Sequence, residues 1–124
     1  MDHSINLLIK IFSKYENLTG SIMSINFDSN KISFIKKLFK VDIENSDLKN
    51  VQYYDYILIS IVDMGISFDE LIKLVNSYKK NFIIEVPTDF AFYKFVKKGK
   101  ISQIDIYDTR NVNLGYYYIT INKN

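Results

Sequence analysis

The chain of 124 residues has no cysteine, one proline, one histidine and four glycines. Without cysteine it can form no disulfide, thiolate metal site or cysteine nucleophile, a composition that suits an intracellular protein. The one histidine, His3, lies near the start of the sequence. A catalytic triad built on histidine and a zinc site are therefore not expected, and no metal-binding residue is assigned.

Neither sign of charge dominates, because 16 basic and 14 acidic side chains leave a formal net charge of +2. This balance gives no bulk electrostatic reason to bind nucleic acid or an anionic membrane. No apolar run approaches the length of a membrane span, and Asp2, His3 and Asn6 interrupt a signal-peptide pattern. We therefore expect a cytoplasmic protein that does not bind a membrane. The composition alone also gives no reason to expect nucleic acid as a partner.

The chain is rich enough in apolar residues to fold by itself. Hydrophobic residues make up 48% of the sequence and charged residues 24%, which excludes a disordered chain. The length suits one domain with a real core, so a single Rossmann-like domain over residues 1–124 is expected.

Apolar spacing alternates between the helical and the strand period along the chain. The expected helices cover residues 5–15, 28–39, 67–78 and 88–99, and the expected strands cover residues 21–27, 40–44, 54–62, 82–87, 101–107 and 115–121. Ser67 and Glu70 form a capping box, Thr88 is expected to cap the last helix, and Gly99 is expected to end it.

This order predicts the α/β class, as a three-layer Rossmann-like sandwich with a mainly parallel sheet of about six strands. No helical segment separates the last two strands, ISQIDIY and GYYYITI. They are expected to pair as an antiparallel hairpin at one edge of the sheet. Alternation in GYYYITI places aromatic residues on both faces, which predicts burial on each side.

The pattern resembles the class I S-adenosylmethionine-dependent methyltransferases over nearly the whole chain. SIMSINF corresponds to the family's first strand, YDYILIS followed by DELIKLVNSYKK to its fourth strand and helix, and FIIEVP to its fifth strand. It is also similar to short archaeal proteins regarded as degenerate relatives of that family. Residues 47–54 are too few for the family's third strand and helix, which leaves KVDIE as an exposed edge.

In the family the first strand ends in a pattern like E-x-G-x-G-x-G, which lets backbone approach the cofactor. Here Ser24 stands at the acidic position, and Asn26, Asp28 and Asn30 stand at the glycine positions. Asparagine and aspartate tolerate left-handed backbone, so the bend is expected to persist. Their side chains should occupy space that the cofactor needs. The resemblance thus implies a domain that has lost catalysis and cofactor and serves as a binding or assembly module.

The alternative within the enzyme class is a minimal methyltransferase. By the resemblance, it would bind S-adenosylmethionine through Asn26, Asp28, Glu44 and Asp47. Glu44, or Asp42 in another register, corresponds to the ribose-binding acid, and Asp47 would face the adenine. These acids are also ordinary turn residues, and no catalytic residue can be assigned.

Two kinds of partner remain to be considered. The exposed KVDIE edge or the opposite hairpin could pair with a second copy of the chain, giving a homodimer, or with another protein. The segments YKKNF and FYKFVKKGK interleave lysines with aromatic residues, as in proteins that bind single-stranded nucleic acid. At helical spacing the same aromatics belong to a core stripe, with the lysines on its solvated face.

Acidic residues follow the predicted parallel strands, where the ligand crevice of such sheets lies. They are Asp28, Glu44, Asp47, Asp63 and Asp89. An acidic rim favours a cation, an amine or a divalent metal, but the preference of helix N-termini for acids predicts the same distribution. Glu85 is the one charge inside FIIEVP. It requires a raised pKa, a cationic partner such as Arg110, or a place at the solvated end of its strand.

Overall fold

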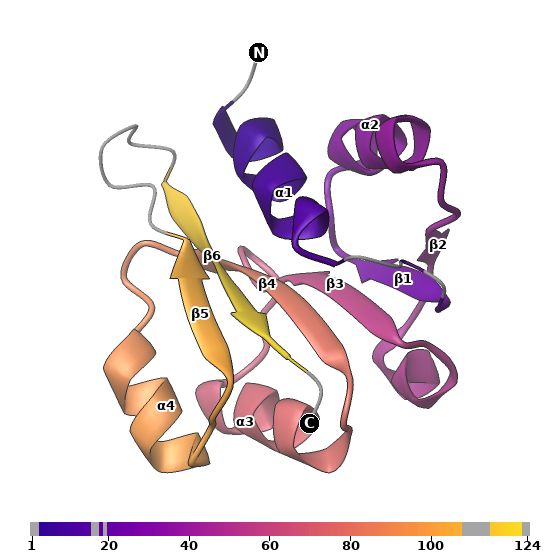
Figure 1. Ribbon diagram of the computed structural model, residues 1–124. Coiled ribbons are helices and arrows are strands. Elements are labelled where there is room, and N and C mark those ends of the chain that lie inside the picture. The colour runs from indigo at the N-terminus through magenta and orange to yellow at the C-terminus, as the bar shows by residue number, and fades with distance from the viewer. Residues whose placement is uncertain (1–2, 16–17, 19, 108–114, 123–124) are drawn as a thin grey trace.

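The computed structural model describes residues 3–15, 18, 20–107 and 115–122, which build one mixed sheet between two pairs of helices (Figure 1). The elements in chain order are α1 (His3–Ser13), β1 (Ile22–Ile25), α2 (Ser29–Phe39), β2 (Glu44–Asn45), the 3-10 helix η1 (Leu48–Tyr53), β3 (Tyr56–Ser60), α3 (Phe68–Ser77), β4 (Asn81–Pro87), α4 (Phe92–Gly99), β5 (Ile104–Tyr107) and β6 (Tyr116–Ile121).

The sheet has six strands in the order β2-β1-β3-β4-β6-β5. Strands β1 to β4 pair in parallel, whereas β6 lies antiparallel between β4 and β5. This arrangement confirms the predicted α/β class with an antiparallel pair at one edge. Helical connections account for the parallel part, because the chain must return to the starting end of the sheet before it enters a parallel strand.

The structure has three layers, a central sheet with a pair of helices on each face. One apolar cluster on each face holds the helices against the sheet. One joins α1 and α2 to the sheet through Leu8, Phe12, Ile35, Leu58 and Tyr118. The other joins α3 and α4 to the opposite face through Leu71, Phe95, Ile57, Phe82 and Ile119. The two aromatic faces predicted for β6 are confirmed, because Tyr117 belongs to one cluster and Tyr118 to the other.

Strand β2 forms the outer edge of the sheet and is only two residues long, Glu44–Asn45. The following connection forms η1, a 3-10 helix in which Val51 is fully buried. The chain therefore reaches β3 without a further strand, as the short spacing predicted. No helix in the part of the chain that the structure describes is long and apolar enough to span a membrane.

The start of α4 differs from the sequence prediction. The helix begins at Phe92 after the N-cap Ala91, so the expected cap at Thr88 is wrong. Strand β4 continues through Pro87, and a turn closed by the Phe90 N–H on the Pro87 carbonyl follows it. That turn places the partly buried Phe90 ring against the core, 5.3 Å from the ring of Phe95. The packing of this aromatic ring stabilises the chain more than a helix start capped by Thr88 would.

Helix α2 ends at Lys40, whose backbone is left-handed with φ of 54°. A residue with a Cβ pays roughly 1 kcal/mol in this conformation. We expect Lys40→Gly to raise the free energy of unfolding by about 0.5 kcal/mol, since the greater freedom of unfolded glycine offsets part of the gain. Urea denaturation followed by circular dichroism measures this change.

Lys37→Gly is the matched control, because Lys37 is an exposed lysine inside the same helix. It should lower the free energy of unfolding by about 1 kcal/mol, the ordinary cost of glycine inside a helix. Destabilisation of similar size by both substitutions would contradict the role given to the left-handed cap.

Candidate functional site

The strand order reverses between β1 and β3. The chain leaves β1 through α2 to reach β2 on one side, and leaves β3 through α3 to reach β4 on the other. Ligands of open α/β sheets bind outside the carboxyl ends of the strands at such a switch point. The carboxyl ends of β1 and β3, with the start of α2, therefore define the candidate site.

Asn26 directly follows β1 and adopts a left-handed backbone with φ of 57°. The predicted persistence of the bend is confirmed at this residue. Its side-chain amide donates hydrogen bonds to the Ser60 carbonyl at 2.9 Å and to the Val62 carbonyl at 3.1 Å. The side chain thus ties the end of β1 to the end of β3 across the switch point.

Asp28 and Asn30 have different roles from Asn26. Asp28 is the N-cap of α2, and its carboxylate accepts a hydrogen bond from the Asn30 backbone N–H at 3.0 Å. Its φ of −59° is accessible to any residue, so no left-handed bend occurs there. Asn30 lies in the first turn of α2 with an exposed side chain. Of the three positions that correspond to the family's glycines by the resemblance, only Asn26 has a left-handed backbone.

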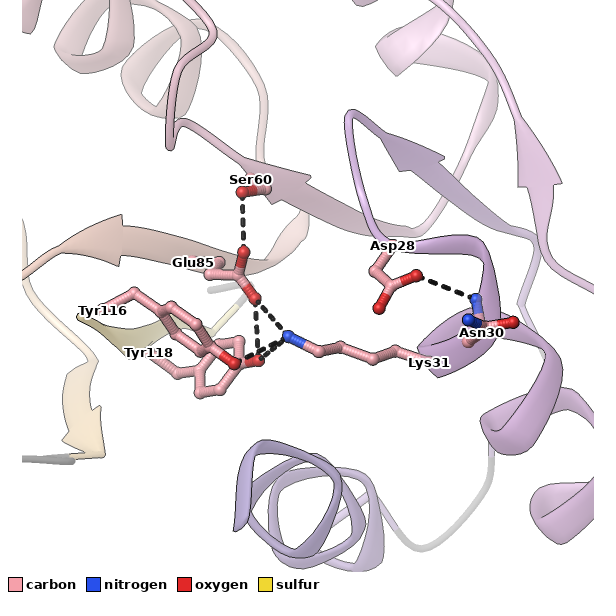
Figure 2. A network of polar contacts seen from close by, with 7 residues as sticks. All are labelled: Asp28, Asn30, Lys31, Ser60, Glu85, Tyr116 and Tyr118. Atoms are coloured by element: carbon pink, nitrogen blue, oxygen red, sulfur yellow. Dashed lines mark hydrogen bonds and ion pairs between the residues drawn. The ribbon is translucent and has the colours of Figure 1, made fainter. Parts of the chain in front are cut away.

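Lys31, also in the first turn of α2, enters a buried polar network beside the site (Figure 2). Its ammonium group lies 3.2 Å from a Glu85 carboxylate oxygen, and both side chains are at most 10% exposed. The same ammonium donates to the Tyr116 hydroxyl at 2.9 Å. Tyr118 and Ser60 donate to the two Glu85 oxygens, each at 2.8 Å. The network joins α2, β3, β4 and β6.

Burial opposes the charge of Lys31, but its partners outweigh that effect. Desolvation lowers the pKa of Lys31, whereas the hydrogen bond to Tyr116 and the charge of Glu85 raise it, and the pKa ends above the ordinary 10.5. Lys31 is then protonated throughout the neutral range. Because the folded pKa is raised, this stabilisation is fully present below pH 10.5 and is lost as the pH rises through the folded value.

The predicted cationic partner of Glu85 exists, but it is Lys31. Arg110, named as a candidate, lies outside the described residues. The alternative of a solvated strand end is wrong, because Glu85 is only 8% exposed. Lys31 was not expected in the core, yet it lies one helical turn before the buried Ile35 on the same stripe. That spacing was the available signal.

Glu44 and Asp47 flank the carboxyl end of β2, which pairs in parallel with β1 through Ser24 and Asn45. Glu44 accepts a hydrogen bond from the Tyr54 hydroxyl at 2.5 Å, and this bond raises the pKa of Tyr54. Glu44 also lines a cavity of about 310 Å³ with Ser21 and Tyr54, at the amino end of β1. Asp47 begins η1 with its carboxylate exposed and 3.8 Å from the Lys49 ammonium.

The other acids form no common site. Asp42 pairs with Lys36 at 3.4 Å on the surface, and Asp63 and Asp89 are exposed. Within the described ranges, no three acidic, histidine or cysteine side chains come together in a way that could hold a metal ion.

Comparison with known proteins yields structural neighbours only. No protein-family model and no curated protein matches the sequence. A chain in the structure of a Pnkp1/Rnl/Hen1 complex is similar in fold, with 11% identity, a TM-score of 0.55, all of this chain covered and 42% of that chain.

Two further structures show weaker likeness. The PH0226 protein from Pyrococcus horikoshii OT3 has 11% identity and a TM-score of 0.45, over 98% of this chain and 90% of that chain. The M1A22 tRNA methyltransferase TrmK of B. subtilis has 12% identity and a TM-score of 0.48, over 91% and 63%. At these identities the likeness concerns the fold alone, which is a Rossmann-like α/β sandwich.

The buried ion pair leads to a test by double-mutant cycle. Lys31→Met or Glu85→Gln alone leaves one buried group without its partner, and each should lower the free energy of unfolding by roughly 3 kcal/mol. The double variant Lys31→Met with Glu85→Gln should recover a substantial part, because no unpaired charge remains. Urea denaturation of the four proteins gives the coupling energy.

Lys36 and Asp42 provide the matched control, an ion pair on the surface with side chains 41% and 78% exposed. Lys36→Met and Asp42→Asn should each change stability by less than about 1 kcal/mol. Equal coupling energies for the buried and the exposed pair would contradict the stated role of burial.

Proposed function

We propose that this chain is a methyltransferase-like domain that has lost methyl transfer and serves, in the cytoplasm, as a binding or assembly module. The observation that carries the proposal is the Asn26 side chain, which spans the switch point between β1 and β3. A cofactor that needs close contact with the backbone there would collide with the Asn26 side chain, which is hydrogen-bonded to the carbonyls of both Ser60 and Val62.

The surroundings of Asn26 support the same proposal. Ser24, at the position of the family's acid, is 4% exposed and offers no carboxylate. The N-terminus of α2 is capped by the Asp28 carboxylate, which already takes the place an anionic ligand group would occupy. We infer that these residues do not fit S-adenosylmethionine in the family's pose, and we assign no catalytic step to them.

The alternative is a minimal methyltransferase that binds S-adenosylmethionine in an altered pose through Asn26, Asp28, Glu44 and Asp47. The methyltransferase-like fold favours this alternative. Against it stands the engagement of these carboxylates within the protein, since Glu44 accepts a hydrogen bond from Tyr54 and Asp28 caps α2.

We propose that the chain assembles with a second copy of itself. The interface would lie at β5, the longer of the two edge strands. Ile106 of β5 is 46% exposed, and Tyr93 on the neighbouring α4 is 86% exposed. Both line a groove of about 650 Å³ that also contains Lys97 and Asp105. Opposite charges on one apolar patch are self-complementary, as an interface between identical copies requires.

Calorimetric titration with S-adenosylmethionine tests the loss of the cofactor site. We expect no affinity tighter than about 1 mM, or roughly −4 kcal/mol. Micromolar affinity would overturn the proposal. The variant Asn26→Gly keeps the left-handed bend and removes the amide bridge, so any residual affinity should rise in this variant. A fall would instead show that Asn26 holds the cofactor, as the enzyme alternative requires.

Light scattering after size exclusion tests assembly through β5. At about 100 µM, an interface that buries a patch of this kind with micromolar affinity should give a dimer. Ile106→Lys should then give a monomer. Leu38→Lys is the matched control, because Leu38 is 49% exposed on α2, and it should leave the dimer intact. A monomeric wild-type protein would rule out the homodimer.

A further inference from the structure

A further cavity lies at the amino end of β4, remote from the switch point. Its volume is about 160 Å³, and its polar lining consists of Asn76, Lys79, Lys80, Lys100, Ser102 and Asn122. From its charge and size we propose that this cavity binds a phosphate group. The inference is independent of the function proposed for the opposite end of the sheet.

The fold brings together lysines from two separate segments. Lys79 and Lys80 follow α3, whereas Lys100 is the C-cap of α4. The two helix ends are held side by side by the Asn76 side-chain amide, which donates to the Gly99 carbonyl at 2.9 Å. The two lysine-rich segments of the sequence therefore contribute to one cavity.

The charge of the cavity is positive and uncompensated. Its lining includes no acidic residue, and within the described ranges no carboxylate lies within 4 Å of the ammonium groups of Lys79, Lys80 or Lys100. Lys80 donates to the Gln52 carbonyl at 3.1 Å, a contact that leaves its charge in place. The carboxyl ends of α3 and α4 contribute about half a negative charge each, which leaves a net charge of roughly +2.

The size of the cavity and its uncharged lining residues limit the kind of ligand that can bind there. Pockets for whole drug-sized ligands usually measure about 300–1,000 Å³, so this cavity suits a small anionic group rather than a complete nucleotide. The Ser102 hydroxyl and the Asn122 amide add neutral donors beside the lysines. Tyr78 lines the same cavity and offers an aromatic ring beside the phosphate. The phosphate can belong to a free compound or to a nucleic acid strand.

The test compares wild type with the double variant Lys79→Gln, Lys100→Gln, which retains the Lys80 contact to Gln52. Two ligands distinguish the sources: inorganic pyrophosphate, followed by calorimetry, and a fluorescein-labelled single-stranded RNA, followed by anisotropy. The variant should bind the relevant ligand at least about fivefold more weakly. For RNA, the logarithmic slope of affinity against salt concentration should also become shallower by about 0.7 for each phosphate that the variant no longer neutralises.

The matched control is the double variant Lys10→Gln, Lys37→Gln, which removes two exposed lysines from α1 and α2. It should bind as wild type does, and circular dichroism confirms folding of both variants. If only the Lys79→Gln, Lys100→Gln variant binds pyrophosphate more weakly, the ligand of the site is a free phosphate compound. If this variant loses affinity for RNA alone, the ligand is a nucleic acid strand. Absence of binding to both ligands, or equal weakening in the two variants, would overturn the proposal.

Discussion

The ion pair between Lys31 and Glu85 fixes the first half of the chain to the second. Removing two charges from water is costly, and only close pairing with satisfied hydrogen bonds offsets the cost. Here Tyr118 and Ser60 occupy both carboxylate oxygens, and Tyr116 accepts from the lysine. The pair therefore constrains the position of α2 over β4 and β6, and with it the connection that carries Asn26 and Asp28.

That constraint bears directly on the candidate site. The start of α2 is where a Rossmann-like fold places the anionic part of its ligand. In this chain the Asp28 carboxylate caps the helix, and the Asn26 amide bridges β1 and β3. Groups of the protein itself thus satisfy backbone polar atoms at the switch point and at the start of α2.

The two ends of the sheet differ in electrostatic character. At the carboxyl end of the parallel strands, Asp28 and Asp47 are the N-cap residues of α2 and η1. At the amino end, lysines collect beyond the ends of α3 and α4 around a small cavity. The net charge of +2 does not reveal this separation, because it sums all 16 basic and 14 acidic side chains of the chain. A binding role is therefore better judged from the separate ends than from the total.

The sequence by itself determined the order of the elements, the two faces of β6 and the antiparallel pair at one edge, since these follow from the local period of apolar residues and from connection length. The left-handed bend at Asn26 was also predictable, because it depends on residue type. Tertiary structure decided the rest. Lys31 and Glu85 are 54 positions apart, and their pairing depends on the packing of α2 against the sheet. Likewise, packing of Phe90 set the start of α4, and docking of α3 against α4 gathered the lysines, because neither contact is encoded by spacing within one segment.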